Sequence, residues 1–474
     1  MQDHAPLLER AFTLDVSEES YRIEEIDGEV PDFVRGTFYA NGPARFTCGE
    51  VRYRHWLDGD GMVCALRFDD AGVHCTNRFV RSTKFVDEEK AGRALYRTFG
   101  TSFASDQLFH HLGIASPVNV SAWYFGGKLL AFGEQGLPWE LDPVTLETRG
   151  EYTFGGRLNP ITPFAAHPSF DPESGEMFNF GISFSQRHPS LNLFRFDRNA
   201  EIRNRRRIPI PYPCSVHDFS LSPSYTIVHL HPHLLDMEGL MSGGKTIMEA
   251  LSWEPERGSR LLIAARESGE QVASVPVGSG YCLHHINTFE EDGRLVVDFV
   301  ELEEPTYPDY EVIPDLFTDA GPGWPVRYVI DTASWEVVEK REIDYRFAPD
   351  LPTIDPRRAT HRSDDHWILG ISKTGQPGRK FFDQLAHLSF SESGKADIWQ
   401  APEKHYLASE PDFIPEPGNG SAGLVICKIF DAERVHDAYL LFNAYDVAAG
   451  PIATLNMKAP VPPRLHGAFY PAGS

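Results

Sequence analysis

The hydrophobic and polar positions of this chain alternate in short runs that are typical of antiparallel β-strands. Runs of β-branched and aromatic residues are separated by turns containing Asp or Gly, as in FEEDGRLVVDFVE and YVIDTASWEVV. An apolar run, a polar turn and a second apolar run predict a β-hairpin. We therefore expect hairpins at residues 141–148, 170–180, 289–301, 328–338, 388–399 and 442–455.

The predicted hairpins recur along most of the chain, but at irregular intervals, so the sequence does not establish a regular repeat. Antiparallel meanders on this scale fit a β-propeller or a large β-sandwich. A propeller has a central axis at which strands from different blades can each present one side chain. The pattern therefore predicts an all-β protein and leaves the architecture open between these two.

Length and composition fit one large folded unit. The chain has 474 residues, of which 41% are hydrophobic, enough for a substantial core. Length alone suggests two or three domains, but large all-β proteins often exceed that size as one domain. The Pro- and Gly-rich stretches at 318–325 and 415–423 are short, as loops between strands are. We predict a single domain over residues 1–474.

The charge balance argues against some partners. There are 44 basic and 68 acidic residues, a formal charge of −24, which repels nucleic acid and anionic lipid at long range. The basic cluster RNRRR at 203–207 is expected to be a solvated hairpin. The first residues lack a signal-peptide pattern, and no apolar run approaches the roughly 18 residues of a spanning helix. We predict a cytoplasmic protein that binds no nucleic acid.

The cysteines indicate no structural role. The six of them form no CxxC pair, and a chain of this length needs no disulfide, so we expect reduced thiols. Cys214 and Cys282 lie three and two residues before histidines of interest, which leaves a mixed Cys/His zinc site conceivable. A small buried strand residue is the more common explanation, and we assign these cysteines no function.

Four histidines in separate strand-like contexts suggest one metal site collected from the whole fold. They are His167 in AHPSFDP, His217 in SVHDFSLSP, His284 in YCLHHINTFEEDG and His466 in RLHGAFYP. Their separations of 50, 67 and 182 residues exclude a local zinc module. Imidazole suits iron, copper, nickel and zinc, and a site of neutral imidazoles requires carboxylates just outside it.

These four motifs, with others in order along the chain, resemble the carotenoid cleavage oxygenase family. The further matches are GTFYANGPARF from Gly36, HWLDGDGM from His55, GKLLAFGEQGLPWELDPVTLET from Gly127, LPTIDPR from Leu351 and SEPDF from Ser409. The resemblance spans the chain. It implies a seven-bladed β-propeller in which long insertions, such as Glu88 to Ala115 and His229 to Leu251, cap one face and form the substrate entrance.

The resemblance also implies a ligand set. His167, His217, His284 and His466 would bind a non-haem Fe(II), with His284 and not the adjacent His285 as the ligand. Four imidazoles on an octahedral ion leave two open positions for O₂ chemistry. The implied reaction is cleavage of one C=C bond of a carotenoid or apocarotenoid by O₂ into two carbonyl products. O₂ and an apolar small molecule are the implied partners.

Three carboxylates are candidates to orient the ligating rings. By resemblance, Glu134 and Glu410 would accept the free ring N–H of a ligand. The family's third glutamate is replaced here by Asp350, which is one methylene shorter, so we expect it to act through a water molecule, unless the alignment is displaced by a residue. His229, His231 and His233 alternate on a strand that Pro232 interrupts, and a metal site there is disfavoured. His110 and His111 are expected to be solvated.

One residue bears on which class of alkene the protein cleaves. The stilbene-cleaving branch of the family generally has a lysine just before the first of these glutamates, and this chain has Gly133. That favours a carotenoid or apocarotenoid over a stilbene or phenylpropene. A binding-only propeller would need no metal, and a calcium-dependent propeller hydrolase would use carboxylate and Asn ligands, so both classes are disfavoured.

A long polyene is nearly insoluble in water, so we expect the substrate to come from a membrane. With a charge of −24, peripheral docking would have to be apolar and local. The segments at 95–112 and 234–241 carry Leu, Phe and Met that suit a membrane patch at the tunnel mouth, with Leu234, Leu235 and Leu240 as its core. Packing of the same residues onto the propeller face is the equal alternative.

Overall fold

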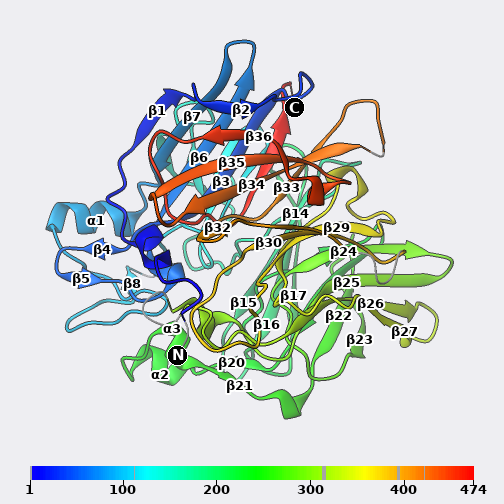
Figure 1. The fold of residues 1–474 in the computed structure, drawn as a ribbon. Helices are drawn as coiled ribbons and strands as arrows, with labels where there is room; N and C mark the ends of the chain where they lie inside the picture. Colours follow the sequence, from blue (N-terminus) through cyan, green and yellow to red (C-terminus); the bar gives the residue numbers. More distant parts are fainter. Residues whose placement is uncertain (1–2, 112, 312–315, 392–395, 421, 474) are drawn as a thin grey trace.

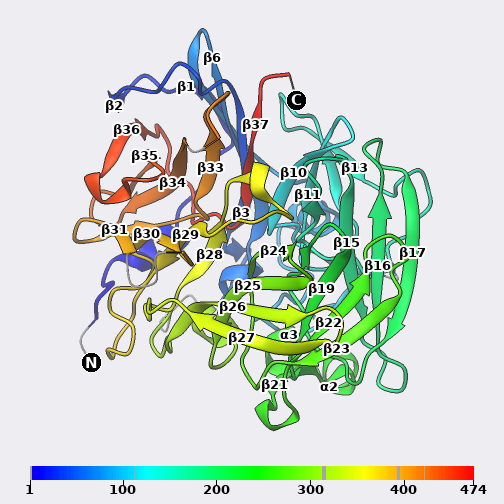
Figure 2. The same cartoon turned by 90° about the vertical axis from the view of Figure 1, so that its right-hand side faces the viewer.

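The computed structural model describes residues 3–111, 113–311, 316–391, 396–420 and 422–473. In these residues seven antiparallel sheets are arranged in a ring, as expected for a seven-bladed β-propeller (Figures 1 and 2). The first three sheets, in hydrogen-bonded order, are β1(Glu19–Arg22), β7(Gly72–Phe79), β6(Asp60–Asp69), β3(Gly36–Arg45) and β37(Gly467–Pro471); β10(Ser121–Phe125), β11(Lys128–Phe132), β12(Trp139–Leu141) and β13(Thr148–Glu151); and β14(Ser169–Phe170), β15(Met177–Ser183), β16(Ser190–Phe196) and β17(Ile202–Pro209).

The remaining four sheets continue around the ring in chain order. They are β18(Ser220–Leu221), β19(Tyr225–Leu230), β22(Arg260–Ala265) and β23(Gln271–Pro276); β24(His285–Glu291), β25(Arg294–Leu302), β26(Gly323–Asp331) and β27(Glu336–Glu342); β28(Asp350–Thr353), β29(Asp365–Gly370), β30(Gln384–Ser389) and β31(Ala396–Gln400); and β2(Ile26–Gly28), β36(Pro451–Asn456), β35(His436–Asn443) and β34(Gly423–Asp431), with β32(His405–Leu407) and β33(Asp412–Pro415) beside β34.

The predicted hairpins are confirmed. Residues 289–301 form β24 and β25, and residues 328–338 lie in β26 and β27. The strands expected within 388–399 are the end of β30 and the start of β31, while the turn at 392–395 lies outside the described residues. The Gly- and Pro-rich stretch 415–423 joins β33 to β34, with Ser421 outside the described residues.

The hydrophobic core lies between neighbouring sheets. Leu261 and Ile263 of β22 pack against Leu295, Val297 and Phe299 of β25 in one buried cluster. Because both faces of a middle strand meet a neighbouring blade, such strands are apolar almost throughout, as the pattern of β25 shows. Outer strands are polar instead. The basic run 203–207 lies in β17 at the outer edge of its sheet, where exposed charged side chains discourage edge-to-edge association.

Both ends of the chain close the ring. The N-terminal strand β2 pairs with β36, so the seventh sheet combines the beginning and the end of the sequence. The C-terminal strand β37 pairs with β3 in the first sheet. This pairing holds the chain next to His466 in place, because β37 begins at the next residue.

Two insertions meet beside the propeller, at the lower left of Figure 1. The first contains α1(Thr83–Ala91), β8(Phe109–His110) and β9(Gly113–Ile114), and the second β20(His233–Leu235), α2(Met237–Met241), α3(Ile247–Ala250) and β21(Leu251–Trp253). Met248 N–H donates to Phe99 O at 3.0 Å across them. The remaining short elements are β4(Thr47–Cys48), β5(Val51–Arg52), η1(Leu8–Phe12), η2(Trp56–Asp58), η3(Pro255–Arg257), η4(Tyr307–Tyr310), η5(Pro356–Arg358) and η6(Val447–Ala449).

Within the described residues, no helix has the length and apolar character needed to cross a membrane.

Candidate metal centre

Each of the four histidines lies just before the strand at the inner end of a sheet. His284 and His466 immediately precede β24 and β37, His167 lies two residues before β14, and His217 lies three residues before β18. These end strands contact one another across the ring, β18 with β24 and β37 with β10 and β33. Equivalent positions in successive blades converge on the propeller axis, so residues far apart in sequence meet there.

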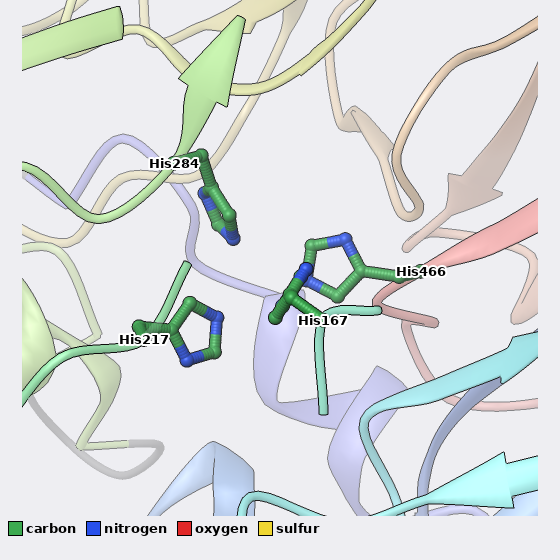
Figure 3. A group of neighbouring side chains, drawn as sticks. All are labelled: His167, His217, His284 and His466. Atoms are coloured by element: carbon green, nitrogen blue, oxygen red, sulfur yellow. The ribbon is translucent and has the colours of Figure 1, made fainter. Parts of the chain in front are cut away.

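The four rings converge on one point (Figure 3). One ring nitrogen from each of His167, His217, His284 and His466 lies within 4.8 Å of the others, and all four residues are buried. The Nε2 atoms of His167 and His284 are buried without a hydrogen-bond partner among the described residues. Four buried imidazoles with nitrogen lone pairs available at a common centre can hold a transition metal ion.

Burial keeps at least two of these rings neutral. Desolvation, together with the neighbouring histidines, lowers the pKa of His167 well below its usual value, and burial lowers the pKa of His466 to about 3. For His217, burial opposes the charged form, but the Glu134 carboxylate outweighs it and raises the pKa. Neutral imidazole is the form that ligates a metal.

Three carboxylates contact the outward nitrogens of three rings. Nδ1 of His217 lies 3.0 Å from Oε1 of Glu134, and Nδ1 of His466 lies 3.2 Å from Oε2 of Glu410. Among the described residues, no carboxylate lies within ion-pair distance of His167. A carboxylate on Nδ1 fixes the ring orientation and leaves Nε2 for the metal.

Asp350 contacts its histidine directly, so the expectation that it acts through water is wrong. His284 Nδ1–H donates to Asp350 Oδ1 at 2.5 Å. The backbone supplies the reach that the shorter side chain lacks: the β28–β29 pairing is irregular between Asp350 and Thr353, and Leu351 has a φ of 56°. A non-glycine residue in this region is strained, and such strain clusters at functional sites.

Asp350 is held as an anion by its donors. Burial disfavours the charged carboxylate, but His284 and the hydrogen bonds it receives hold the pKa of Asp350 below its usual value. The rings are neutral, so the negative charge that a divalent ion needs has to come from outer carboxylates such as the Asp350 anion.

The neighbouring histidines face elsewhere. Nδ1 of His285 lies 3.0 Å from Ser220 Oγ, so of the adjacent pair it is His284 that joins the group. His229 and His231 approach each other at 3.2 Å through their Nδ1 atoms, and Pro232 separates β19 from β20 as expected. His110 does have an acidic neighbour, Asp87 at 3.6 Å, which the sequence gave no reason to expect. The four-residue group contains no cysteine.

An apolar cavity of about 380 Å³ lies beside the group and is lined by residues of both insertions. Its wall includes Val216, which adjoins His217, Ala165, which lies two residues before His167, and Glu134. Its wall is largely apolar, with Phe99, Ile114, Phe164, Leu235, Leu251 and Tyr307 among the lining residues.

The predicted membrane patch is corrected by this packing. Leu235 and Leu240 are buried, at 5% and 3% exposure, in a cluster with Leu108 and Ala250 that joins the two insertions. They belong to the core of the cap, which was the alternative explanation. Leu234 is half-buried, and Leu112 lies outside the described residues. The exposed apolar side chains in this region are Met241 and Ile161, at 53% and 61%.

Several residues near the site had no signal in the sequence. Tyr307 lines the cavity, and its carbonyl oxygen accepts a hydrogen bond from His55 Nε2 at 2.8 Å. The Tyr310 hydroxyl donates to Asp350 Oδ2 at 3.1 Å. His55 lies in the HWLDGDGM motif, which the sequence marked without a role, whereas the tyrosines lie in an unremarkable loop sequence, EPTYPDY.

A propeller with a buried four-histidine centre and an apolar cavity beside it defines a class of metal-dependent enzymes, and comparison with known proteins identifies the family. Residues 13–471 match the family described as retinal pigment epithelial membrane protein, RPE65. Apocarotenoid-15,15'-oxygenase of Synechocystis is 30% identical over 97% of this chain and 95% of its own length. The chain belongs to this family, and it is an oxygenase.

Other relatives have different names. Isoeugenol monooxygenase of Pseudomonas nitroreducens is 27% identical over 94% of both chains, and lignostilbene-α,β-dioxygenase isozyme III of Sphingomonas paucimobilis is 24% identical over 94% of this chain and 92% of its own. Among solved structures, cobalt-substituted Synechocystis apocarotenoid oxygenase superposes with a TM-score of 0.89 at 26% identity, covering 99% of this chain and 100% of the other.

Proposed function

We propose that this protein is an iron(II)-dependent dioxygenase that cleaves one C=C bond of a carotenoid or apocarotenoid into two carbonyl products. His167, His217, His284 and His466 are the proposed ligands, and Glu134, Asp350 and Glu410 the residues that orient three of them. Residues 1–474 act in this proposal as one catalytic domain. The observation that carries it is the buried four-histidine group with an apolar cavity beside it, whose wall includes Glu134, the partner of His217.

The donor set supports iron. All four candidate ligands are imidazoles, and two of them present buried Nε2 atoms that have no partner among the described residues. A bound Fe(II) would supply the open coordination positions at which O₂ reacts with an electron-rich alkene. The protein's own part is to hold the rings in register, exclude water and present one double bond to the centre.

The cavity favours a polyene over a phenol. Among the described residues, Arg97 is the only basic one in its lining, and its guanidinium is engaged by Asp106 at 2.7 Å. At Gly133, the place of the lysine in the stilbene-cleaving branch, a Cβ would lie 2.1 Å from Ser116 Oγ and 3.1 Å from Val118 Cα. A larger side chain there would have to displace Ser116, and glycine itself offers no cation to a phenolate.

The alternative substrate is a stilbene or phenylpropene, as the names of two relatives suggest. A substrate panel tests the two. Iron-loaded protein is given apocarotenals of several lengths, isoeugenol and a hydroxystilbene, and the products are identified by mass spectrometry, with His284→Ala as the inactive control. We expect kcat/KM to be highest for an apocarotenal, with two carbonyl fragments. A higher kcat/KM for either phenol would support the alternative, and no cleavage of any alkene would overturn the proposed function.

Uptake from a membrane and a cytoplasmic location stay predictions. The packing of Leu235 and Leu240 shifts any apolar contact to exposed side chains such as Met241, which is not among the described residues that line the cavity. A Met241→Ser variant should bind liposomes less while cleaving detergent-dispersed substrate at the same rate. Equal liposome binding by the variant and the wild type would place the contact elsewhere.

A further inference from the structure

Asp350 receives hydrogen bonds from three donors, and two of them come from other parts of the chain. His284 Nδ1–H and the backbone N–H of Leu351 donate to Oδ1 at 2.5 and 2.8 Å. The Tyr310 hydroxyl donates to Oδ2 at 3.1 Å. Tyr310 ends η4, 40 residues before Asp350, and it belongs neither to the four-histidine group nor to the described residues that line the cavity.

The Tyr310 ring is rigidly packed. The side chain is 4% exposed, and its ring lies against Trp56 at 5.3 Å and Phe317 at 5.4 Å between centroids. The same η4 turn is anchored at its start by the bond from His55 Nε2 to Tyr307 O. A phenol fixed in this way offers its hydroxyl in one place, so it can define the plane of a carboxylate that hydrogen-bonds to it.

A short carboxylate needs such a fixed partner. The residue after Asp350, Leu351, has a strained backbone with a φ of 56°, and a strained segment persists when its surroundings hold it. Both other donors bind Oδ1, so Tyr310 is the donor that fixes Oδ2 and with it the plane of the carboxylate toward Nδ1 of His284. An imidazole that has lost its orienting partner binds a metal less tightly.

We propose that Tyr310 is a positioning residue for the metal centre. Tyr310 acts through Asp350 on His284, and it compensates for the side chain of Asp350 being shorter than that of a glutamate. The inference rests on the proposed function in one respect, that the histidine group holds a metal. It assigns Tyr310 no contact with substrate. Its effect should therefore appear in metal retention and in the geometry at the metal, and only secondarily in turnover.

The test is the rate of cobalt loss from the full-length protein to a chelator. Co(II) is loaded into the wild type, Tyr310→Phe, Asp350→Asn and the double variant, and its visible absorption bands report both occupancy and geometry. Tyr310→Phe removes only the hydroxyl and keeps the ring packing. Tyr345→Phe is the matched control, because Tyr345 is equally buried and its hydroxyl donates to Gln384 at 3.0 Å, outside this network.

We expect Tyr310→Phe to lose cobalt about 10-fold faster than the wild type. This is the lower end of the loss in metal affinity that is typical when a residue that orients a metal ligand is replaced. The absorption bands of Tyr310→Phe should shift, Tyr345→Phe should match the wild type, and Tyr310→Phe should add little in the Asp350→Asn background. The inference would be overturned if Tyr310→Phe retained cobalt as well as the wild type does. It would also be overturned if Tyr310→Phe accelerated cobalt loss in the Asp350→Asn background as much as it does in the wild-type background. If the wild type itself binds no cobalt or iron, the proposed function fails instead. The thermal melting of each metal-free variant separates a folding defect from either result.

Discussion

Three of the four histidines in the site have a carboxylate beside the outward-facing ring nitrogen. Glu134 and Glu410 approach with the longer side chain, from the loop after β11 and from a position two residues before β33. Asp350 approaches with the shorter one, from the first residue of β28. The three carboxylates come from three different blades.

Glu134→Gln and Glu410→Gln should weaken the site by degrees. Glutamine keeps the shape but replaces the carboxyl group beside Nδ1 of the histidine, so metal retention or turnover should fall by roughly 10- to 100-fold. The measurements are iron content after dialysis against a chelator and the initial rate of cleavage. Glu270→Gln, which changes an exposed pair with Arg206, is the control and should behave as the wild type. Wild-type iron content and rate in both site variants would show that these carboxylates do not orient the ligands.

The two insertions stabilise one another, and this shapes the cavity that they border. Leu235, Leu240 and Ala250 of the second insertion bury their side chains against Leu108 of the first. The Arg97 guanidinium donates to the carbonyl oxygen of Lys245 at 2.9 Å across the same junction. The two insertions therefore form a small hydrophobic core, which we call the cap. Some of its apolar residues also line the cavity.

Leu240→Ala should lower the stability of the cap. Truncation of a buried leucine costs about 2–5 kcal/mol, so the melting temperature should fall. Met241→Ala, at the adjacent exposed position, should leave it within the range of a neutral surface change, about 0.5 kcal/mol. Thermal melting and liposome co-sedimentation of both variants are the measurements. A loss of liposome binding in Leu240→Ala at an unchanged melting temperature would restore this leucine to a membrane patch.

The sequence predicted the strands better than it predicted the cap. Asp- and Gly-containing turns between apolar runs are local signals, and the hairpins at 289–301 and 328–338 followed from them. Whether Leu235 and Leu240 face water depends on the first insertion, which packs against them through Leu108 from far earlier in the chain. An apolar stripe has the same pattern whether it faces a membrane or another segment of the chain.

The strand that closes the propeller also positions one histidine of the site. His466 lies at the start of β37, the strand with which the C-terminus completes the first sheet. Its backbone N–H donates to Val120 O at 3.2 Å, which also links it to the second sheet. The proposed ligand His466 is thus held by two blades.

Gly467→Ala tests this coupling. A Cβ at this position would lie 2.0 Å from Tyr39 O in β3, so the two strands have to separate. We expect destabilisation of about 1–3 kcal/mol, typical of overpacking, together with a lower iron content. Gly420→Ala, which would meet nothing within 4 Å, is the matched control. Unchanged melting and iron content in Gly467→Ala would show that the fit of β37 does not govern the site.

The candidate site was accessible from sequence only where motifs were local. The four histidines and Glu134 and Glu410 lie in short recognisable stretches, and the resemblance places them together. The partnership of Tyr310 with Asp350, and the direct contact of Asp350 with His284, depend on how two loops approach each other in three dimensions. Side-chain length alone suggested a water bridge, because it took no account of the strained backbone at Leu351.

The central claim is that four histidines from four blades hold one iron, and the iron content per chain tests it most directly. Iron is measured by mass spectrometry in the wild type, in alanine variants of His167, His217, His284 and His466, and in His285→Ala as the control. We predict about one iron per wild-type chain, near-complete loss in each of the four variants, and retention in His285→Ala, with every protein folded by circular dichroism. Full iron in His284→Ala with loss in His285→Ala, or a wild type that retains no iron, would contradict the account.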